Sequence, residues 1–335
     1  MKSEDMILKA AIVHILDSSV GIPVLSDQSM EVGPDFSDFL KAHIEKITES
    51  DDVKHCTFAE GSEVKELLQN CTPDNFVETS KQLAERLYDI MNANIDIPAA
   101  DVAMTVFGCK GKDYLAFLKM NYKTSYTHQT RETDGGNSNE IILQRALLPG
   151  QGQRLSEAFV LDLSDGSLIL AEKKYEVNGE KCFYFSELFL ECRAPLSQKS
   201  KLDIVTRAVD QVAKKYYGDD AQKKMEIKDI ICNELEEQGE IKVSELREKV
   251  FPGSPEMLEE LDEKLDRYNL SYETVAPKNE QTIKKFQKQK LYTDTGIEIT
   301  IPMEEYRNPD HVEFITNMDG TISVLIKNIG MLSSK

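Results

Sequence analysis

Apolar and polar positions in the first half of the chain follow the patterns of strands and a few helices. Residues 6–16 predict a strand, and Gly21-Ile22-Pro23 with Val24-Leu25 predicts the turn and return of an opening hairpin. Apolar residues at three- and four-residue spacing predict a helix over Phe36–Ile47. Thr72-Pro73 then supplies a cap and a first-turn proline for a second helix that runs to about Ala93.

A run of strands follows this helical stretch. Val102–Phe107 and Tyr114–Leu118, separated by a glycine-containing turn, predict a hairpin. Asp165-Gly166 and Asn178-Gly179 are turn dipeptides between later strands. Those later strands are expected at residues 141–147, 158–163, 167–173 and 182–190. The polar segment Thr127–Asn139 is expected to be a solvated or disordered loop, with ligand binding as the alternative.

The pattern becomes helical after Pro195. Apolar residues from Leu202 to Tyr216 recur in steps of three and four, and residues 225–267 predict three more helices with breaks near Gly239 and at Pro252-Gly253. Strands return at residues 296–301, 311–316 and 321–327. The chain is therefore expected to be an α+β protein with two domains. Residues 1–195 would form a mainly antiparallel sheet with packed helices, and residues 196–335 a helical segment followed by a small β-hairpin region.

Charge constrains the function more than any other property of the composition. The 335 residues contain 40 basic and 59 acidic side chains, for a formal charge of -19, which on average repels nucleic acids and anionic membranes. A polyanionic partner would need a local basic patch or a bridging protein. No apolar stretch is long enough to cross a bilayer, and the six scattered cysteines suit a reducing cytoplasm.

Motifs for catalysis, cofactors or metals are weak. Gly108–Lys112 lacks the spacing of a phosphate-binding loop, and the five histidines are too far apart for helical metal-ligand spacing. His14 and His43 are expected in or beside a core, and the cysteines are typical of inert buried thiols. An enzyme would need a site without a spacing signature, around His128 and Asp134. No catalytic residue, cofactor or metal is therefore predicted.

Two basic segments are the candidates for phosphate contact, with solvated surface as the alternative reading. The run from residue 278 to 290 has five lysines against Glu280. The first choice is Lys278, Lys284, Lys285, Lys288 and Lys290. The second choice is Lys199, Lys201, Arg207, Lys214 and Lys215. In this second group Asp203 with Arg207, and Asp210 with Lys214, have the spacing of ordinary surface ion pairs. Residues 256–266 carry six acids against Lys264, which argues against a DNA-reading helix there.

The order of these pieces resembles the bacterial 37-kDa nucleoid-associated protein family of the NdpA type, over nearly the whole chain. Four segments carry the resemblance: Ala11–Leu16, Phe58–Leu67, Tyr114–Leu118 and Gly296–Ile301 with its closing hairpin. The resemblance implies a cytoplasmic protein found with the compacted chromosome, with reported DNA association and no known enzymatic activity or cofactor.

Two hypotheses about function follow. The favoured one is a non-enzymatic nucleoid-associated protein that binds double-stranded DNA directly through the basic segment around Lys284, Lys285, Lys288 and Lys290. The alternative is an acidic adaptor whose helices at 225–267 bind a basic protein of the DNA machinery. No membrane partner is expected. The sequence leaves the oligomeric state open, with a homo-oligomer among the alternatives.

Overall fold

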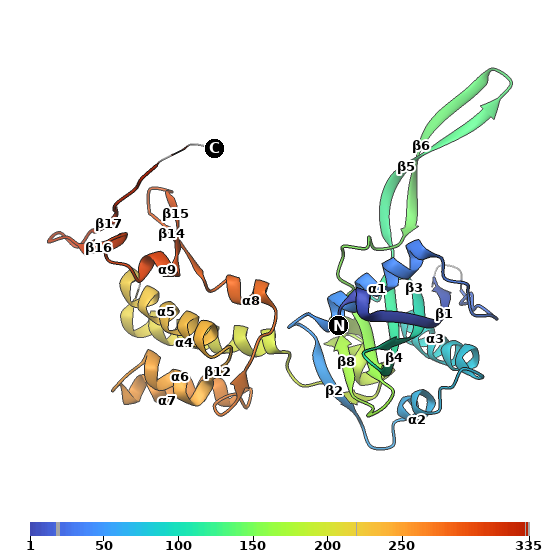
Figure 1. The fold of residues 1–335 in the computed structure, drawn as a ribbon, viewed down its shortest axis with the longest axis horizontal. Coiled ribbons are helices and arrows are strands. Elements are labelled where there is room, and N and C mark those ends of the chain that lie inside the picture. The colour runs from blue at the N-terminus through green and yellow to red at the C-terminus, as the bar shows by residue number, and fades with distance from the viewer. Residues whose placement is uncertain (18–20, 219, 332, 334–335) are drawn as a thin grey trace. The chain divides into compact units, whose positions relative to one another are not determined.

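A computed structural model of the chain describes residues 1–17, 21–218, 220–331 and 333 (Figure 1). The chain divides into two compact units, Met1–Ser197 and Gln198–Lys335. Each unit is described by itself below.

The N-terminal unit is built on one seven-stranded sheet in which every strand is antiparallel to its neighbours. In spatial order the strands are β1 (Met6–Leu16), β3 (Ala100–Cys109), β4 (Lys112–Asn121), β7 (Glu157–Asp162), β8 (Leu168–Ala171), β2 (Lys54–Phe58) and β11 (Cys192–Arg193). This confirms the predicted antiparallel sheet, the opening strand and the hairpin of β3 and β4. The return of the opening hairpin is a single bridge between Ile15 and Val24. Residues 18–20 of that connection lie outside the described residues.

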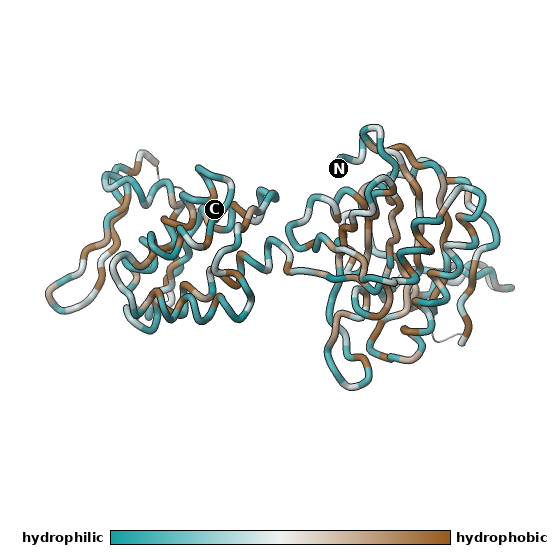
Figure 2. The backbone as a smooth tube through the Cα atoms, turned by 90° about the horizontal axis from the view of Figure 1, so that it is seen from below, coloured by the Kyte–Doolittle hydropathy of each residue, from teal (hydrophilic) through white to brown (hydrophobic). Residues whose placement is uncertain are grey.

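Helices cover both faces of this sheet. On one face, α2 (Glu63–Gln69) and α3 (Phe76–Ala93) contribute to a core that includes Phe117 of β4. On the other face, α1 (Pro34–Thr48) packs over Ala116 and Leu118, the two neighbours of Phe117 in the strand. Successive strand residues point to opposite faces, so the continuous apolar run of β4 is buried on both sides. Hydrophobic colouring follows the strands of this unit in Figure 2.

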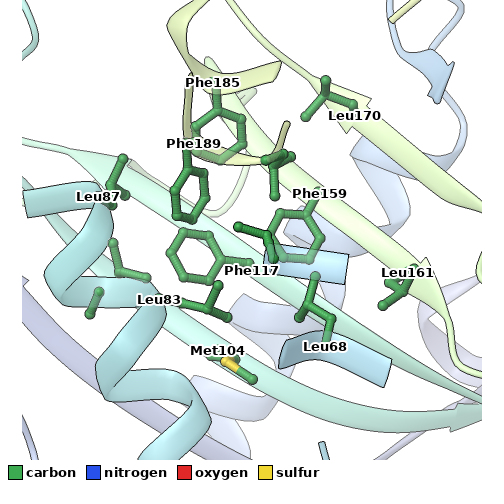
Figure 3. Packing of buried hydrophobic residues seen from close by; sticks show 14 of the residues in the cluster. Leu68, Leu83, Leu87, Met104, Phe117, Phe159, Leu161, Leu170, Phe185 and Phe189 are labelled. Carbon is green, nitrogen blue, oxygen red and sulfur yellow. The ribbon is translucent and has the colours of Figure 1, made fainter. Parts of the chain in front are cut away.

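Aromatic rings fill the centre of the α3 face. Phe117 stacks on Phe159 at a centroid distance of 5.3 Å and lies equally close to Phe189 (Figure 3). Phe189 belongs to a π-helical turn, Phe185–Phe189, where a strand over residues 182–190 was predicted. That prediction was wrong because a short apolar run does not distinguish a strand from a buried helical turn. The strand ends at Cys182 in the hairpin of β9 (Tyr175–Val177) and β10 (Glu180–Cys182).

The predicted start of the long helix also needs correction. Helix α3 begins at Phe76, with Asn75 as its N-cap residue in place of Thr72. The side-chain oxygen of Asn75 accepts a hydrogen bond from the backbone N–H of Thr72 at 2.6 Å. Asn75 therefore holds residues 72–75 in a turn, and the proline belongs to this turn and not to the helix.

Strands β5 (Lys123–Thr133) and β6 (Gly136–Leu147) form an arm that continues directly from β4 and projects from the unit (Figure 1). The two strands pair with each other in a separate two-stranded sheet. The prediction of a loop over Thr127–Asn139 was wrong. Asp134-Gly135 is a two-residue hairpin turn, and the threonines of β5 are β-branched residues that favour strands even where the segment is polar.

The C-terminal unit has four main helices, α4 (Gln198–Tyr217), α5 (Ala221–Glu237), α6 (Val243–Val250) and α7 (Pro255–Asp266). Small pairs of strands and two short helices surround or follow them, which confirms the predicted order of helices and then hairpins. These are β12 (Ile241–Lys242), β13 (Thr274–Val275), α8 (Glu280–Lys284), β14 (Lys288–Tyr292), β15 (Glu298–Pro302), α9 (Met303–Tyr306), β16 (Val312–Thr316) and β17 (Ile322–Ile326). Strand β14 was not predicted, because its lysines hide the alternating pattern of a strand. It pairs with the more apolar strand β15.

Candidate nucleic-acid interface

A cavity of about 430 Å³ lies in the C-terminal unit between α4, α5 and the connection from α8 to β14. We call it the lysine pocket because four lysines and one carboxylate supply all of its charged side chains. Its lining residues are Thr206, Asp210, Lys214, Lys224, Ile227, Lys228, Ile231, Lys285, Phe286 and Gln289. The pocket brings together segments that are up to 83 residues apart in sequence.

Helical spacing explains why these side chains meet. Asp210 and Lys214 are four residues apart on α4, and so are Lys224 and Lys228 on α5. Residues four apart lie on one face of a helix, so each helix contributes two charged side chains to the pocket. The long stems of these lysines can lie along apolar walls while the ammonium groups stay at the solvent side.

Buried apolar residues form part of the wall of the lysine pocket. Ile227 and Ile231 are 5% and 3% exposed, and Phe286 packs against a small core that contains Met225 and Met303. Lys228 also links α5 to β14, because its Nζ donates a hydrogen bond to the carbonyl oxygen of Lys288 at 2.7 Å. The pocket is therefore lined by ordered elements of the unit.

Electrostatics in the pocket favour an added anion. Burial lowers the pKa of Lys228, and burial also raises the pKa of Asp210, although Lys228 and Lys224 counter the latter effect. Asp210 is the one carboxylate among the lining residues, so the charged side chains of the pocket are mostly cationic. In the described residues of α4, Asp203 forms no ion pair with Arg207 and Asp210 forms none with Lys214, so α4 is not the ordinary paired surface that the spacing suggested. In the described part of the chain, Lys214 and Lys285 have no ion-pair partner.

Most other lysines of the two predicted segments are paired with carboxylates. Lys284 contacts Glu280 at 2.9 Å, and Lys290 contacts Glu298 at 2.6 Å across the hairpin of β14 and β15. Lys201 pairs with Glu273 at 2.6 Å, and Lys215 pairs with Glu260 at 2.5 Å.

The remaining candidates lie elsewhere. Lys278 and Lys288 are exposed, and Lys199 is half-buried near the start of α4. Arg207 lines a separate cavity of about 260 Å³ with Lys264 and Arg267. The structure therefore brings one residue from each predicted group, Lys285 and Lys214, into the same pocket.

Sequence reasoning missed Lys224 and Lys228. The available signal was their four-residue spacing, but the predicted helices began at residue 225, after Lys224, and the helical region as a whole is acidic. The structure does not bring together His128 and Asp134, the two residues named for the enzyme alternative. His128 lies within β5 and Asp134 follows the end of that strand, so six residues of extended chain, roughly 20 Å, separate them.

The chemistry of the pocket suits a phosphate group. Ammonium groups act as compact charges toward a phosphate oxygen, without the fixed two-pronged geometry of arginine. Such contacts position a nucleic acid through its backbone and do not read its bases. In the described residues, no group of three His, Cys, Asp or Glu side chains could hold a metal ion.

A family model described as NA37, nucleoid-associated protein YejK, matches residues 12–331. The chain belongs to this family. The matched range extends over most of both units and includes all four lysines of the pocket. The match confirms the resemblance inferred from the sequence. The NA37 family is described by its association with the nucleoid and is not an enzyme family. No curated protein matches the chain.

The helices were also compared with the length and apolar character that a bilayer requires. Within residues 1–17, 21–218, 220–331 and 333, no helix has both the length and the apolar character needed to cross a bilayer.

Proposed function

We propose that this chain is a non-enzymatic, cytoplasmic protein of the nucleoid that binds double-stranded DNA directly, through the lysine pocket and the surface around it. The observation that carries this proposal is the grouping of four lysines around one carboxylate in a chain whose formal charge is -19. Membership of a nucleoid-associated family supports the same partner.

A local group of lysines can attract DNA even when the whole protein is acidic. Salt screens charges separated by more than about 10 Å at 0.1 M ionic strength, so distant carboxylates weaken the local attraction only partly. Each phosphate neutralised by a lysine releases condensed counterions, and this release favours binding independently of base sequence. We therefore expect moderate, salt-dependent affinity with little sequence preference.

Neutralising the pocket lysines should weaken DNA binding selectively. In the variant K214Q/K285Q we expect affinity for a fluorescently labelled duplex of arbitrary sequence to fall about 20-fold at 0.1 M salt. The slope of log affinity against log salt should become shallower by about 1.8, since each lost phosphate contact removes about 0.9. Fluorescence anisotropy over a series of salt concentrations measures both quantities.

The matched control is K284Q/K290Q, which changes the net charge equally and stays in the same unit. Both of these lysines already pair with a carboxylate, Lys284 with Glu280 at 2.9 Å and Lys290 with Glu298 at 2.6 Å. We expect the control to bind within about threefold of the wild type. Equal losses in both variants would mean that overall charge, and not the pocket, governs binding. Absence of wild-type binding at low salt would refute direct contact.

Helix α7 supports the adaptor as a second candidate function. Its exposed side includes Glu256, Glu259 and Glu263, and these acids would attract a basic protein surface and repel phosphates. Co-sedimentation with isolated nucleoids separates the two candidates. An adaptor should lose co-sedimentation in E256Q/E259Q/E263Q and keep it in the pocket variant, whereas direct DNA binding predicts the reverse.

A further inference from the structure

We infer that the arm formed by β5 and β6 binds a second copy of this chain, so that two copies exchange arms in a symmetric dimer. This inference goes beyond the proposed DNA contact and does not depend on it. It is based on the pairing, the exposed side chains and the charge of the arm.

One face of the arm is apolar over the half nearer its base, and the polar pairs of Thr130 with Asn139 and Glu132 with Asn137 continue the same face toward the turn. Tyr126 pairs directly with Leu143, and His128 pairs with Ile141 two positions further along β5. Directly opposed residues and every second residue share a face of an antiparallel ladder, so these four side chains lie together. Tyr126, Ile141 and Leu143 are 73%, 71% and 41% exposed.

The opposite face of the arm is polar, apart from Ile142. It includes Gln129 opposite Glu140 and Arg131 opposite Ser138. Arg131 and Glu140 form an ion pair at 3.4 Å. Over its inner half the arm therefore has an apolar and a polar face, which is typical of a strand pair that packs against something on one side only.

A two-stranded hairpin is marginally stable by itself in water and usually needs a third strand or a packed layer. The base of the arm is held, because Lys123 donates to the side chain of Gln153 and Tyr122 donates to Asp101 at 2.5 Å. Beyond the base, the strands of the arm pair only with each other in the described part of the chain. A layer on the apolar face would supply the missing support.

Charge favours a protein partner over nucleic acid at the arm. Residues 123–147 carry three basic side chains, Lys123, Arg131 and Arg145, and three acidic ones, Glu132, Asp134 and Glu140. The arm therefore has no net attraction for phosphates. Two copies of a chain with charge -19 repel each other on average, so a neutral arm is where they can approach at the lowest electrostatic cost.

Area favours a second copy over an unrelated partner. The ten paired positions of the arm extend over about 34 Å, and a two-stranded ribbon about 10 Å wide offers roughly 340 Å² on one face. A stable interface buries about 800 Å² on each partner. One arm on an unrelated protein supplies less than half of this. In a two-fold exchange each copy contributes its own arm and the surface that receives the other arm, which roughly doubles the area.

The test is the oligomeric state of the full chain without DNA, by sedimentation equilibrium. We expect a wild-type dimer, and in I141T/L143T a dissociation constant raised at least tenfold. Threonine keeps the strand preference of these positions while it removes apolar surface. The matched control is I142T, which makes the same chemical change at the neighbouring residue on the opposite face and should shift the constant less than threefold.

A wild-type chain that remains monomeric at about 100 µM would overturn the inference, and so would a dimer that I141T/L143T leaves intact or that I142T weakens equally. Amide hydrogen exchange of the wild type provides a measurement without substitutions. Protection of residues 125–144 should increase with protein concentration, and protection that does not change would count equally against the exchanged arms.

Discussion

Replacing Glu157 by leucine should lower the free energy of unfolding of the N-terminal unit by about 3–5 kcal/mol, because it leaves a buried lysine without its counter-charge. Lys119 and Glu157 lie on neighbouring strands β4 and β7, and both side chains are 0% exposed. The Nζ of Lys119 is 3.7 Å from the Oε2 of Glu157 and donates to the carbonyl oxygen of Pro98 at 3.2 Å. Asn121 donates to the same carboxylate oxygen at 2.9 Å.

Urea unfolding followed by circular dichroism measures this loss. Two controls separate burial from charge. Asp113→Asn, a substitution on β4 like those at Lys119, breaks the half-exposed ion pair with Lys9 of β1 and should cost less than about 1 kcal/mol. The double variant K119M/E157L removes both charges and should recover most of the stability. If E157L costs no more than D113N, the lysine is hydrated or neutral in place, and the pair does not act as a buried ion pair.

Acid should destabilise the N-terminal unit by roughly 3 kcal/mol between pH 6.5 and pH 4 through His14 alone. Burial, and to a smaller extent the nearby Lys81, lower the pKa of His14 from 6.5 to about 4. The unfolded chain therefore binds a proton as the pH falls through 6.5, whereas the folded chain stays neutral until about pH 4. Stability from this group is fully present above pH 6.5 and decreases across that interval.

Hydrogen bonds explain why His14 stays neutral. The backbone N–H of Ser26 donates to Nδ1 at 3.1 Å, so the ring proton is on Nε2 and donates to the hydroxyl of Ser80 at 3.0 Å. That hydroxyl donates in turn to the carbonyl oxygen of Val77 at 2.6 Å. A second ring proton, on Nδ1, would point at the N–H of Ser26, so the charged form of the ring is disfavoured.

Thermal unfolding of the wild type and H14N between pH 4.5 and 7 tests this expectation. The variant should be less stable at pH 7 and should lose less stability on acidification. Identical pH dependence in the wild type and H14N would show that His14 titrates normally in the folded chain. Burial also lowers the pKa of His43, so some acid sensitivity should persist in H14N.

Local rules predicted the fold where one physical effect dominates. The apolar stripe of α4 and the turn at Asn178-Gly179 follow directly from helical spacing and from two residues that accept positive φ, here 52° and 84°. The π-helical turn at Phe185–Phe189 could not be predicted, because tertiary packing against Phe117 decides its conformation. The arm was missed because composition was given more weight than the Asp134-Gly135 turn.

The candidate site was likewise predictable only in part from the sequence. Counting charges along the chain pointed to Lys285 and, as a second choice, to Lys214, but it could not show that they meet. Lys290 looked equally available until the pairing of β14 with β15 placed Glu298 beside it. Availability of a lysine depends on contacts between distant residues, and linear charge density does not contain that information.

The two units each have a hydrophobic core of their own, and only four residues separate the end of β11 at Arg193 from the start of α4 at Gln198. The chain should therefore melt in two calorimetric steps. A ligand that binds one native unit raises the midpoint of that unit's step alone. A heat-capacity scan of the unaltered protein with and without duplex DNA would thus assign the ligand to a unit, since the endotherm that moves identifies where the DNA is held.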